Sequence, residues 1–162
     1  MIFENFLYRA LRSEEIDAGF ILIPKSQREF KALPRLGIDT RLPFILGETV
    51  EHAVRQHQWQ QNGFPTRGIS TTPHIHRATF YAQRYQIIVR IDRSSLNRFG
   101  IKEYVVAELL SKSSQDIACQ EDNEVILVRE QDGAWPKEVI DQVLKLDSNG
   151  KPCQYGGADK DK

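Results

Sequence analysis

Hydrophobic positions in this chain fall into short runs separated by polar and turn-forming residues. Short runs rich in β-branched and aromatic residues are typical of strands. They predict strands at "FLYRAL" (6–11), "FILI" (20–23), "RGIST" (67–71), "QIIVRI" (86–91) and "EVILV" (124–128). The last run is mostly apolar, which indicates a strand covered on both faces.

Apolar residues with helical spacing predict three longer helices. The stripes that define them are Val50, Ala53, Val54 and His57; Ala78, Tyr81, Ala82 and Tyr85; and Val139, Ile140, Val143 and Leu144. We expect the first helix to end near Gly63. The second should take Thr72 as its N-cap and Pro73 as its first residue, because the N–H that proline lacks would be unpaired there. The third follows Pro136 and closes the fold.

The remaining segments complete the predicted architecture. "EEIDAG" (14–19) predicts one helical turn, and "VVAELL" (105–110) fits a helix and a strand equally well. Residues 25–47 predict an irregular loop, because prolines recur along them and just before them. Short strands with helices between and after them indicate an α+β domain. We expect a single catalytic domain over 1–146 and a flexible tail over 147–162.

Composition narrows the classes of partner. The chain has 162 residues, with 22 Lys and Arg against 22 Asp and Glu. A formal net charge of zero argues against a general nucleic-acid or anionic-membrane binder, although it leaves room for a local basic patch. No apolar run is long enough to span a bilayer, and the N-terminus has no secretory pattern. We therefore expect cytoplasmic folding and action, with leaderless export into a target cell left open, and no membrane partner.

Three features far apart in the sequence carry candidate chemistry. Arg9 lies in an otherwise apolar strand, Ser70-Thr71-Thr72 lies at a strand-to-helix junction, and Glu124 opens an apolar strand. An arginine fork suits phosphate, and hydroxyls at a helix start suit phosphate or ribose. A carboxylate can stabilise the oxocarbenium-like state of a breaking glycosidic bond. Together they match a dinucleotide whose glycosidic bond is broken.

Each feature also has a plain structural interpretation. A lone arginine in an edge strand usually makes a structural ion pair. A Ser-Thr-Thr run before a helix is usually an N-cap, and a glutamate at a strand start is usually a solvated charge. Taken singly, each of these interpretations is the better one. Only the combination of the three favours a site.

The order and spacing of these motifs resemble the ADP-ribosyltransferase superfamily, in its Arg-Ser-Glu branch of cholera- and pertussis-like toxins. The matching segments are "LYRAL", "AGF", "GISTTPHIHRATFYA", "IIVRID", "NEVILV" and "WPKEVI". The resemblance covers about residues 7–146. It implies two packed, mostly antiparallel sheets with flanking helices around an NAD-binding cleft. It further implies a mono-ADP-ribosyltransferase that uses NAD as a substrate and needs no metal. By analogy with the relatives, a role as a bacterial toxin or effector stays open.

The resemblance also implies roles for individual residues. Arg9 would contact the phosphate and ribose of NAD. Ser70 would order the cleft and hold Glu124, while Thr71 and Thr72 support the site from the strand end. Glu124 would bind the nicotinamide ribose 2′-hydroxyl and stabilise the oxocarbenium ion.

Further residues complete this expected site. Asp122 departs from the family pattern, because many relatives have Glu or Gln two residues before the catalytic Glu, where it helps to choose the acceptor. Asp122 is shorter, yet it can still guide a cationic acceptor, so it is a second catalytic candidate. Tyr81 and His74 are candidates for NAD binding, although core packing and exposure explain them as well. Arg12 competes with Arg9 for the phosphate.

Three functions therefore stay open. The first is transfer of ADP-ribose to a macromolecule, with a protein acceptor ranked ahead of a nucleic acid. The second is an NAD glycohydrolase with water as the acceptor, which the shorter Asp122 favours. The third is a binding domain of the same fold without turnover. The sequence gives no oligomeric state, and the spacing of Cys119 and Cys153 indicates neither a zinc site nor a disulfide.

Overall fold

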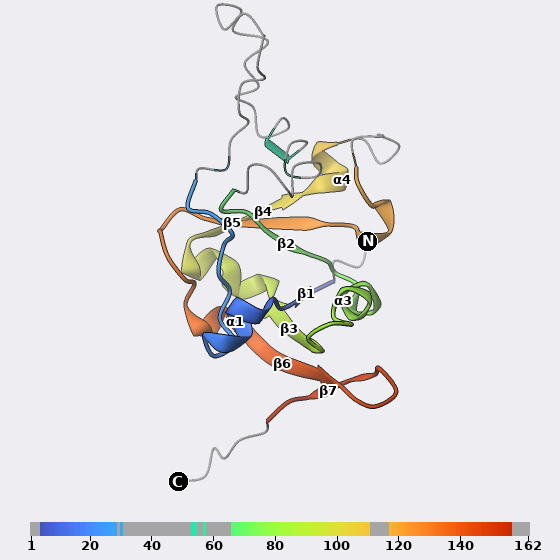
Figure 1. The fold of residues 1–162 in the computed structure, drawn as a ribbon. Helices are drawn as coiled ribbons and strands as arrows, with labels where there is room; N and C mark the ends of the chain where they lie inside the picture. The colour runs from blue at the N-terminus through green and yellow to red at the C-terminus, as the bar shows by residue number, and fades with distance from the viewer. Residues whose placement is uncertain are drawn as a thin grey trace, which may run out of the picture.

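The computed structural model describes residues 4–28, 30, 53–54, 57, 66–110 and 117–156, which form a mixed α/β fold of two antiparallel sheets with few helices (Figure 1). The first sheet has the order β1-β3-β6-β7 and the second has the order β2-β5-β4. Every strand pair is antiparallel. The α+β class with mostly antiparallel sheets is thus confirmed.

Most of the elements coincide with apolar runs of the sequence. The strands are β1 (Phe6–Ala10), β2 (Ile69–Thr71), β3 (Ile87–Asp92), β4 (Ile101–Val105), β5 (Val125–Arg129), β6 (Ile140–Leu146) and β7 (Pro152–Gln154). The helices are α1 (Ser13–Asp17), α3 (Ile75–Tyr81) and α4 (Val106–Leu109), with 3₁₀ turns η1 (Arg93–Phe99), η2 (Gln120–Asp122) and η3 (Lys137–Val139). The undecided segment 105–110 contains the end of β4 and then α4.

The central strands are apolar at successive positions because both of their faces are buried. In β5, Val125 and Leu127 belong to the core between the sheets. Ile126 and Val128 belong to a second cluster with α4. In β3, the alternate residue Ile88 packs against α3. The prediction of a doubly covered strand at 124–128 is confirmed.

One backbone bridge joins the edges of the two sheets. The Tyr8 N–H donates to the Thr72 carbonyl at 2.7 Å, and the Thr72 N–H donates to the Tyr8 carbonyl at 3.0 Å. β1 and β2 are the edge strands that meet there, and α3 follows directly after Thr72 (Figure 1). Residues near positions 9 and 70 are thereby brought together from distant parts of the chain.

The closing helix predicted after Pro136 is wrong. Only the 3₁₀ turn Lys137–Val139 forms there, and the strand Ile140–Leu146 follows. The register between β3 and β6 shifts by one residue, so that Arg90 faces Gln142 while Ile91 faces Ile140. This bulge places Ile140 and Val143 against the same core, and a spacing of three residues imitates a helix.

The strand predicted at 20–23 is also absent, because its backbone groups have other partners. The Ile21 N–H donates to the Glu15 carbonyl at 3.2 Å, and the Ile23 N–H donates to the Glu15 carboxylate at 3.2 Å. The Leu22 carbonyl accepts from the Trp135 N–H at 3.0 Å. Side-chain and loop contacts thus replace a sheet ladder.

The helix after the triplet is shorter than predicted. It begins at Ile75 with His74 as the N-cap residue, because the backbone of Thr72 is engaged in the bridge. It ends at Tyr81, so the expected stripe is only half correct. Ala78 and Ala82 are buried, whereas Tyr81 and Tyr85 are exposed.

Other expectations fall partly outside the described residues. Ala53, Val54 and His57 are helical, and the rest of the helix expected at 50–63 lies outside, as does most of the loop expected at 25–47. Within the expected tail, Pro152–Gln154 forms β7 and pairs with β6, so order extends beyond residue 146. No helix in the described part of the chain has the length and apolar character to cross a membrane.

Candidate functional site

A cavity of about 480 Å³ opens beside the junction of β1 and β2. Seven of the predicted site residues line it: Arg9, Ser70, Thr71, Thr72, Tyr81, Asp122 and Glu124. A volume of this size is typical of small-molecule sites. The fold therefore brings an arginine, four hydroxyl groups and two carboxylates to one place from segments remote in the sequence.

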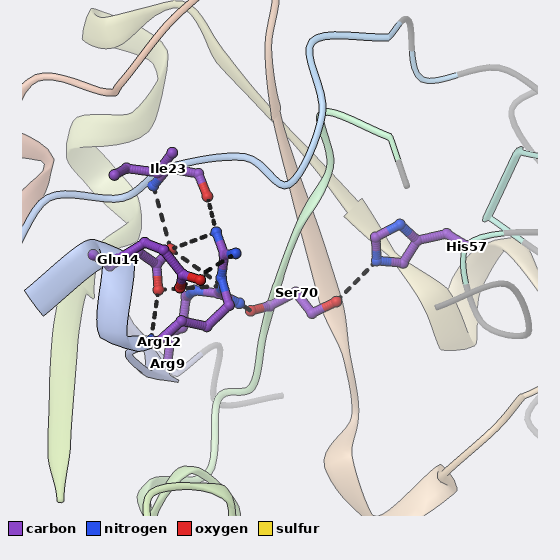
Figure 2. A network of polar contacts seen from close by, with 7 residues as sticks. Arg9, Arg12, Glu14, Ile23, His57 and Ser70 are labelled. Carbon is purple, nitrogen blue, oxygen red and sulfur yellow. Dashed lines mark hydrogen bonds and ion pairs between the residues drawn. The ribbon is translucent and has the colours of Figure 1, made fainter. Parts of the chain in front are cut away.

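Arg9 is held by a buried carboxylate and a strand carbonyl (Figure 2). Its guanidinium donates to Glu15 Oε1 at 3.2 Å and to the Ser70 carbonyl oxygen at 3.1 Å. The Glu15 side chain has an exposed fraction of 0%. Burial lowers the pKa of Arg9, although the guanidinium stays charged. Arg9 thus makes the ion pair of the plain interpretation and also forms part of the cavity wall.

Glu15 is a residue that the sequence analysis missed. Its carboxylate accepts from the Arg12 N–H at 2.9 Å and from the Ile23 N–H at 3.2 Å, in addition to Arg9. A glutamate three residues after a helix start is half of a capping box, and this local signal was present in "RSEE". Nothing local signals its bond to Ile23 or its complete burial.

His57 lies between Ser70 and Glu124. Its Nε2 is 2.8 Å from Ser70 Oγ and 3.6 Å from Glu124 Oε1, while its Nδ1 is 3.4 Å from Thr66 Oγ1. The His57 ring therefore forms a hydrogen bond with Ser70, whereas Glu124 lies beside the ring and beyond hydrogen-bond distance. His57 thus positions the Ser70 hydroxyl next to Glu124, a part of the site that the resemblance did not include.

The imidazole of His57 is neutral near pH 7. Burial, and then the positive charges of Lys25 and Arg9, lower its pKa to about 4. Figure 2 shows His57 and the Arg9 cluster on opposite sides of Ser70. From the sequence, His57 is predicted only as part of a helical stripe, because its partners lie in other segments.

The two threonines support the site through internal hydrogen bonds. Thr71 Oγ1 donates to the Val125 carbonyl at 2.7 Å, and Thr72 Oγ1 donates to the Asp122 carbonyl at 2.6 Å. Thr72 Oγ1 also accepts from the His74 N–H at 3.1 Å. These bonds connect the end of β2 to the residues on either side of Glu124.

Asp122 is occupied by two donors. Arg77 Nε donates to its Oδ1 at 2.7 Å, and the Tyr81 hydroxyl donates to its Oδ2 at 2.6 Å. Burial and the bond to Asp122 raise the pKa of Tyr81 to about 12, and the same carboxylate raises the pKa of Arg77. Asp122 would have to release a donor before it could guide an acceptor. Arg77 was not predicted as part of this arrangement.

His74 is the one predicted site residue that the structure does not bring to the cavity wall. Its Nδ1 lies 3.6 Å from Glu4 Oε1, and its Nε2 lies 2.7 Å from Asn123 Nδ2. These contacts hold it at the start of α3. Tyr81, in contrast, lines the cavity with an exposed fraction of 53%.

Positive charge prevails along the cavity wall. Its charged residues are Arg9, Arg12, Lys25, Arg28 and Arg84 against Asp122 and Glu124. Burial, and then the neighbouring charges of Arg12 and Arg9, lower the pKa of Lys25. An anionic ligand such as a pyrophosphate would offset this concentration of cations.

Comparisons with known proteins leave the site to be interpreted on its geometry. Neither a protein-family model nor a curated protein matches the chain. Among the described residues, no three His, Cys, Asp or Glu side chains are grouped so that they could hold a metal ion.

The first prediction concerns the buried carboxylate. Glu15→Gln should lower the free energy of unfolding by about 3–5 kcal/mol, because Arg9 would remain buried without its counter-charge. The measurement is urea denaturation. Glu14→Gln is a matched control one residue away, since the Glu14 side chain is 65% exposed, and its unfolding midpoint should be unchanged. Equal midpoints for all three proteins would contradict the central role of Glu15.

The second prediction concerns pH. Between the ordinary histidine pKa of about 6.5 and the folded value of about 4, the unfolded chain binds a proton at His57 that the folded chain does not. Stability is therefore lost as the pH falls through this window, by on the order of 3 kcal/mol for this group. His57→Gln should remove that part of the pH dependence of the free energy of unfolding. Parallel profiles for the two proteins would contradict the neutral buried imidazole.

Proposed function

We propose that the protein is a mono-ADP-ribosyltransferase that cleaves NAD at the nicotinamide glycosidic bond and transfers ADP-ribose to a macromolecular acceptor. The observation that carries this proposal is the convergence of Arg9, Ser70 and Glu124 on one cavity wall. Each residue alone has a plain structural explanation. Their meeting from three remote segments is what an NAD-cleaving site of the resembled type requires.

The cationic part of the cavity suits the pyrophosphate of NAD. Arg9 is fixed between Glu15 and the Ser70 carbonyl, and Arg12, Lys25 and Arg28 add further positive charge. Arginine binds phosphate oxygens through a planar fork, and a fork already held in place loses little entropy on binding. This end would bind the substrate and orient its nicotinamide ribose toward Glu124.

Glu124 would act on the ribose. Its carboxylate would accept a hydrogen bond from the 2′-hydroxyl and stabilise the positive charge that develops at the anomeric carbon. The C–N bond breaks, and its electron pair leaves with nicotinamide. A lone pair of the acceptor then forms the new bond to the anomeric carbon, and the proton of the acceptor is released. The imidazole of His57 lies 3.6 Å from the carboxylate and, because it is neutral, would leave the negative charge of Glu124 available to the substrate.

A second candidate function is NAD hydrolysis on the same site. The specific observation in its favour is that both oxygens of Asp122 already accept hydrogen bonds, from Arg77 and Tyr81. A carboxylate so engaged is poorly placed to activate a side-chain nucleophile. Water would then attack the anomeric carbon in place of a macromolecule.

The decisive test of NAD cleavage is Glu124→Gln. It should lower the rate of nicotinamide release by about 100-fold or more, because a neutral amide cannot stabilise the developing charge. NAD affinity measured by calorimetry and the thermal midpoint should be retained. Glu138→Gln, an exposed position on η3, is the control and should keep full activity. Wild-type protein that neither binds NAD nor releases nicotinamide would end the proposal, and NAD binding without turnover in either form would favour a binding domain.

A separate measurement distinguishes transfer from hydrolysis. Nicotinamide release from purified protein is compared with release in a cell lysate that contains NAD labelled in its ADP-ribose part. A transferase should release nicotinamide faster in the lysate and attach label to macromolecules. Equal rates and no attached label would favour the glycohydrolase.

A further inference from the structure

Positive charge is segregated within this neutral chain. Residues 52–91 contain five arginines and all four histidines, and they contain no aspartate or glutamate. The rest of the chain carries the matching excess of acidic residues. In the fold, Arg67, Arg77 and Arg90 pair with Asp132, Asp122 and Asp141, so the charge that is not offset in the described part of this segment lies at Arg84.

Exposed apolar side chains gather on the same segment. Five large apolar side chains are exposed among the described residues, and four of them belong to α3 or the turn after it: Ile75, Phe80, Tyr81 and Tyr85. Phe80 is 60% exposed, and its ring centroid lies 5.3 Å from that of Tyr81. Exposed apolar side chains that gather in one patch are typical of a binding surface, whereas single exposed ones are ordinary.

Arginines stack on these rings. The Arg77 guanidinium lies 4.9 Å from the centroid of Phe80, and that of Arg84 lies 5.2 Å from the centroid of Tyr85. Asp122 neutralises Arg77, whereas the structure gives Arg84 no ion pair within the described part of the chain. We call Arg77, Phe80, Tyr81, Arg84 and Tyr85 the α3 surface.

The α3 surface adjoins the candidate active site. Tyr81, Arg84 and Tyr85 line the cavity, and α3 packs beside β1 (Figure 1). A molecule bound on this surface would therefore reach the cavity where the ribose of NAD is expected. This is the place that an acceptor must occupy.

We propose that the α3 surface binds single-stranded nucleic acid and that this is the acceptor class, a statement that rests on the proposed transferase function. Exposed aromatic rings stack on unpaired bases, and guanidinium groups bind phosphates and stack as well. An acidic peptide would use the cations but would leave the rings without partners. Bases within a duplex are already stacked, so a duplex fits less well.

Transfer to nucleic acid forms and breaks the same bonds as the NAD cleavage described above. A nitrogen or oxygen atom of the nucleic acid forms the bond to the anomeric carbon. Nicotinamide leaves with the electron pair of the broken C–N bond, and a proton on the attacking atom passes to solvent. No oxidant, reductant or metal enters the balance.

Binding is tested first, without NAD. Fluorescence anisotropy would follow labelled DNA and RNA single strands of about 15 nucleotides, a length that covers a typical single-strand site. Duplex DNA of the same sequence and labelled polyglutamate are the comparisons. We expect both single strands to bind more tightly than either comparison, with affinity that falls steeply as salt rises. The stronger of the two single strands identifies DNA or RNA as the source.

Two variants test the surface, each with a matched control. Phe80→Ala and Arg84→Gln should each weaken single-strand binding by about tenfold, because one stacking or phosphate contact is lost. Tyr155→Ala removes the one exposed large aromatic outside the α3 surface in the described residues. Arg98→Gln removes an exposed arginine that stacks on Phe99 at 4.7 Å. Both controls should bind as the wild type does, and thermal midpoints would verify that all four variants fold.

Several outcomes would overturn the inference. No single-strand binding, equal binding of polyglutamate, or equal effects of the variants and controls would each do so. The acceptor role is tested by digesting the labelled lysate products with nuclease or with protease, and label that only protease releases would also overturn it. If nicotinamide is released and the label is attached to protein alone, the transferase proposal is supported and the nucleic-acid acceptor is wrong. If single strands bind but no nicotinamide is released, the binding surface is supported and the transferase proposal is wrong.

Discussion

The buried carboxylate of Glu15 is the interaction on which the rest of the site depends. It accepts from the guanidinium of Arg9 and from the backbone N–H groups of Arg12 and Ile23, and so it connects the end of β1, the start of α1 and the segment after it. Arg9 carries the connection across to β2 through the Ser70 carbonyl. A buried charge needs several hydrogen-bond partners, because a buried charged group without them lowers the free energy of unfolding. The geometry around the cavity is therefore determined largely by a group that does not line it.

The electrostatic character of the cavity follows from the same arrangement. Cations gather near Arg9, and their charge together with burial keeps the imidazole of His57 neutral. A neutral ring can form a hydrogen bond with Ser70 without adding another positive charge beside Glu124. The cavity thus has a strongly cationic region and, across Ser70, a carboxylate beside an uncharged imidazole. This polarity matches a ligand with phosphates at one end and a developing cation at the other.

The sequence predicted what depends on local pattern. The apolar runs of β3 and β5 located the core strands to within one residue, because both faces of these strands are covered along most of their length and the covered positions are apolar. It failed where two elements act on each other. The bulge opposite Ile91 gave the apolar residues of β6 a helical spacing. The segment 20–23 forms no strand, because its backbone binds Glu15 in place of a neighbouring strand.

The candidate site divides in the same way. Arg9, Ser70 and Glu124 could be selected from the sequence, because their residue types suit phosphate, ribose and a developing cation and their order matches the resembled family. Glu15, His57 and Arg77 could not, because their importance lies in partners that the chain reaches only after folding, such as Asp122 for Arg77. For the same reason, the sequence could not show that both carboxylate oxygens of Asp122 accept hydrogen bonds.

The bridge between Tyr8 and Thr72 also affects how the protein behaves at high concentration. β1 and β2 are both edge strands, and an open edge is a template for pairing with another chain. Here the two edges meet at one bridge, and at the far side of the first sheet the edge strand β7 is only three residues long. The junction that forms one wall of the cavity therefore also leaves less of each edge open to pairing with another chain.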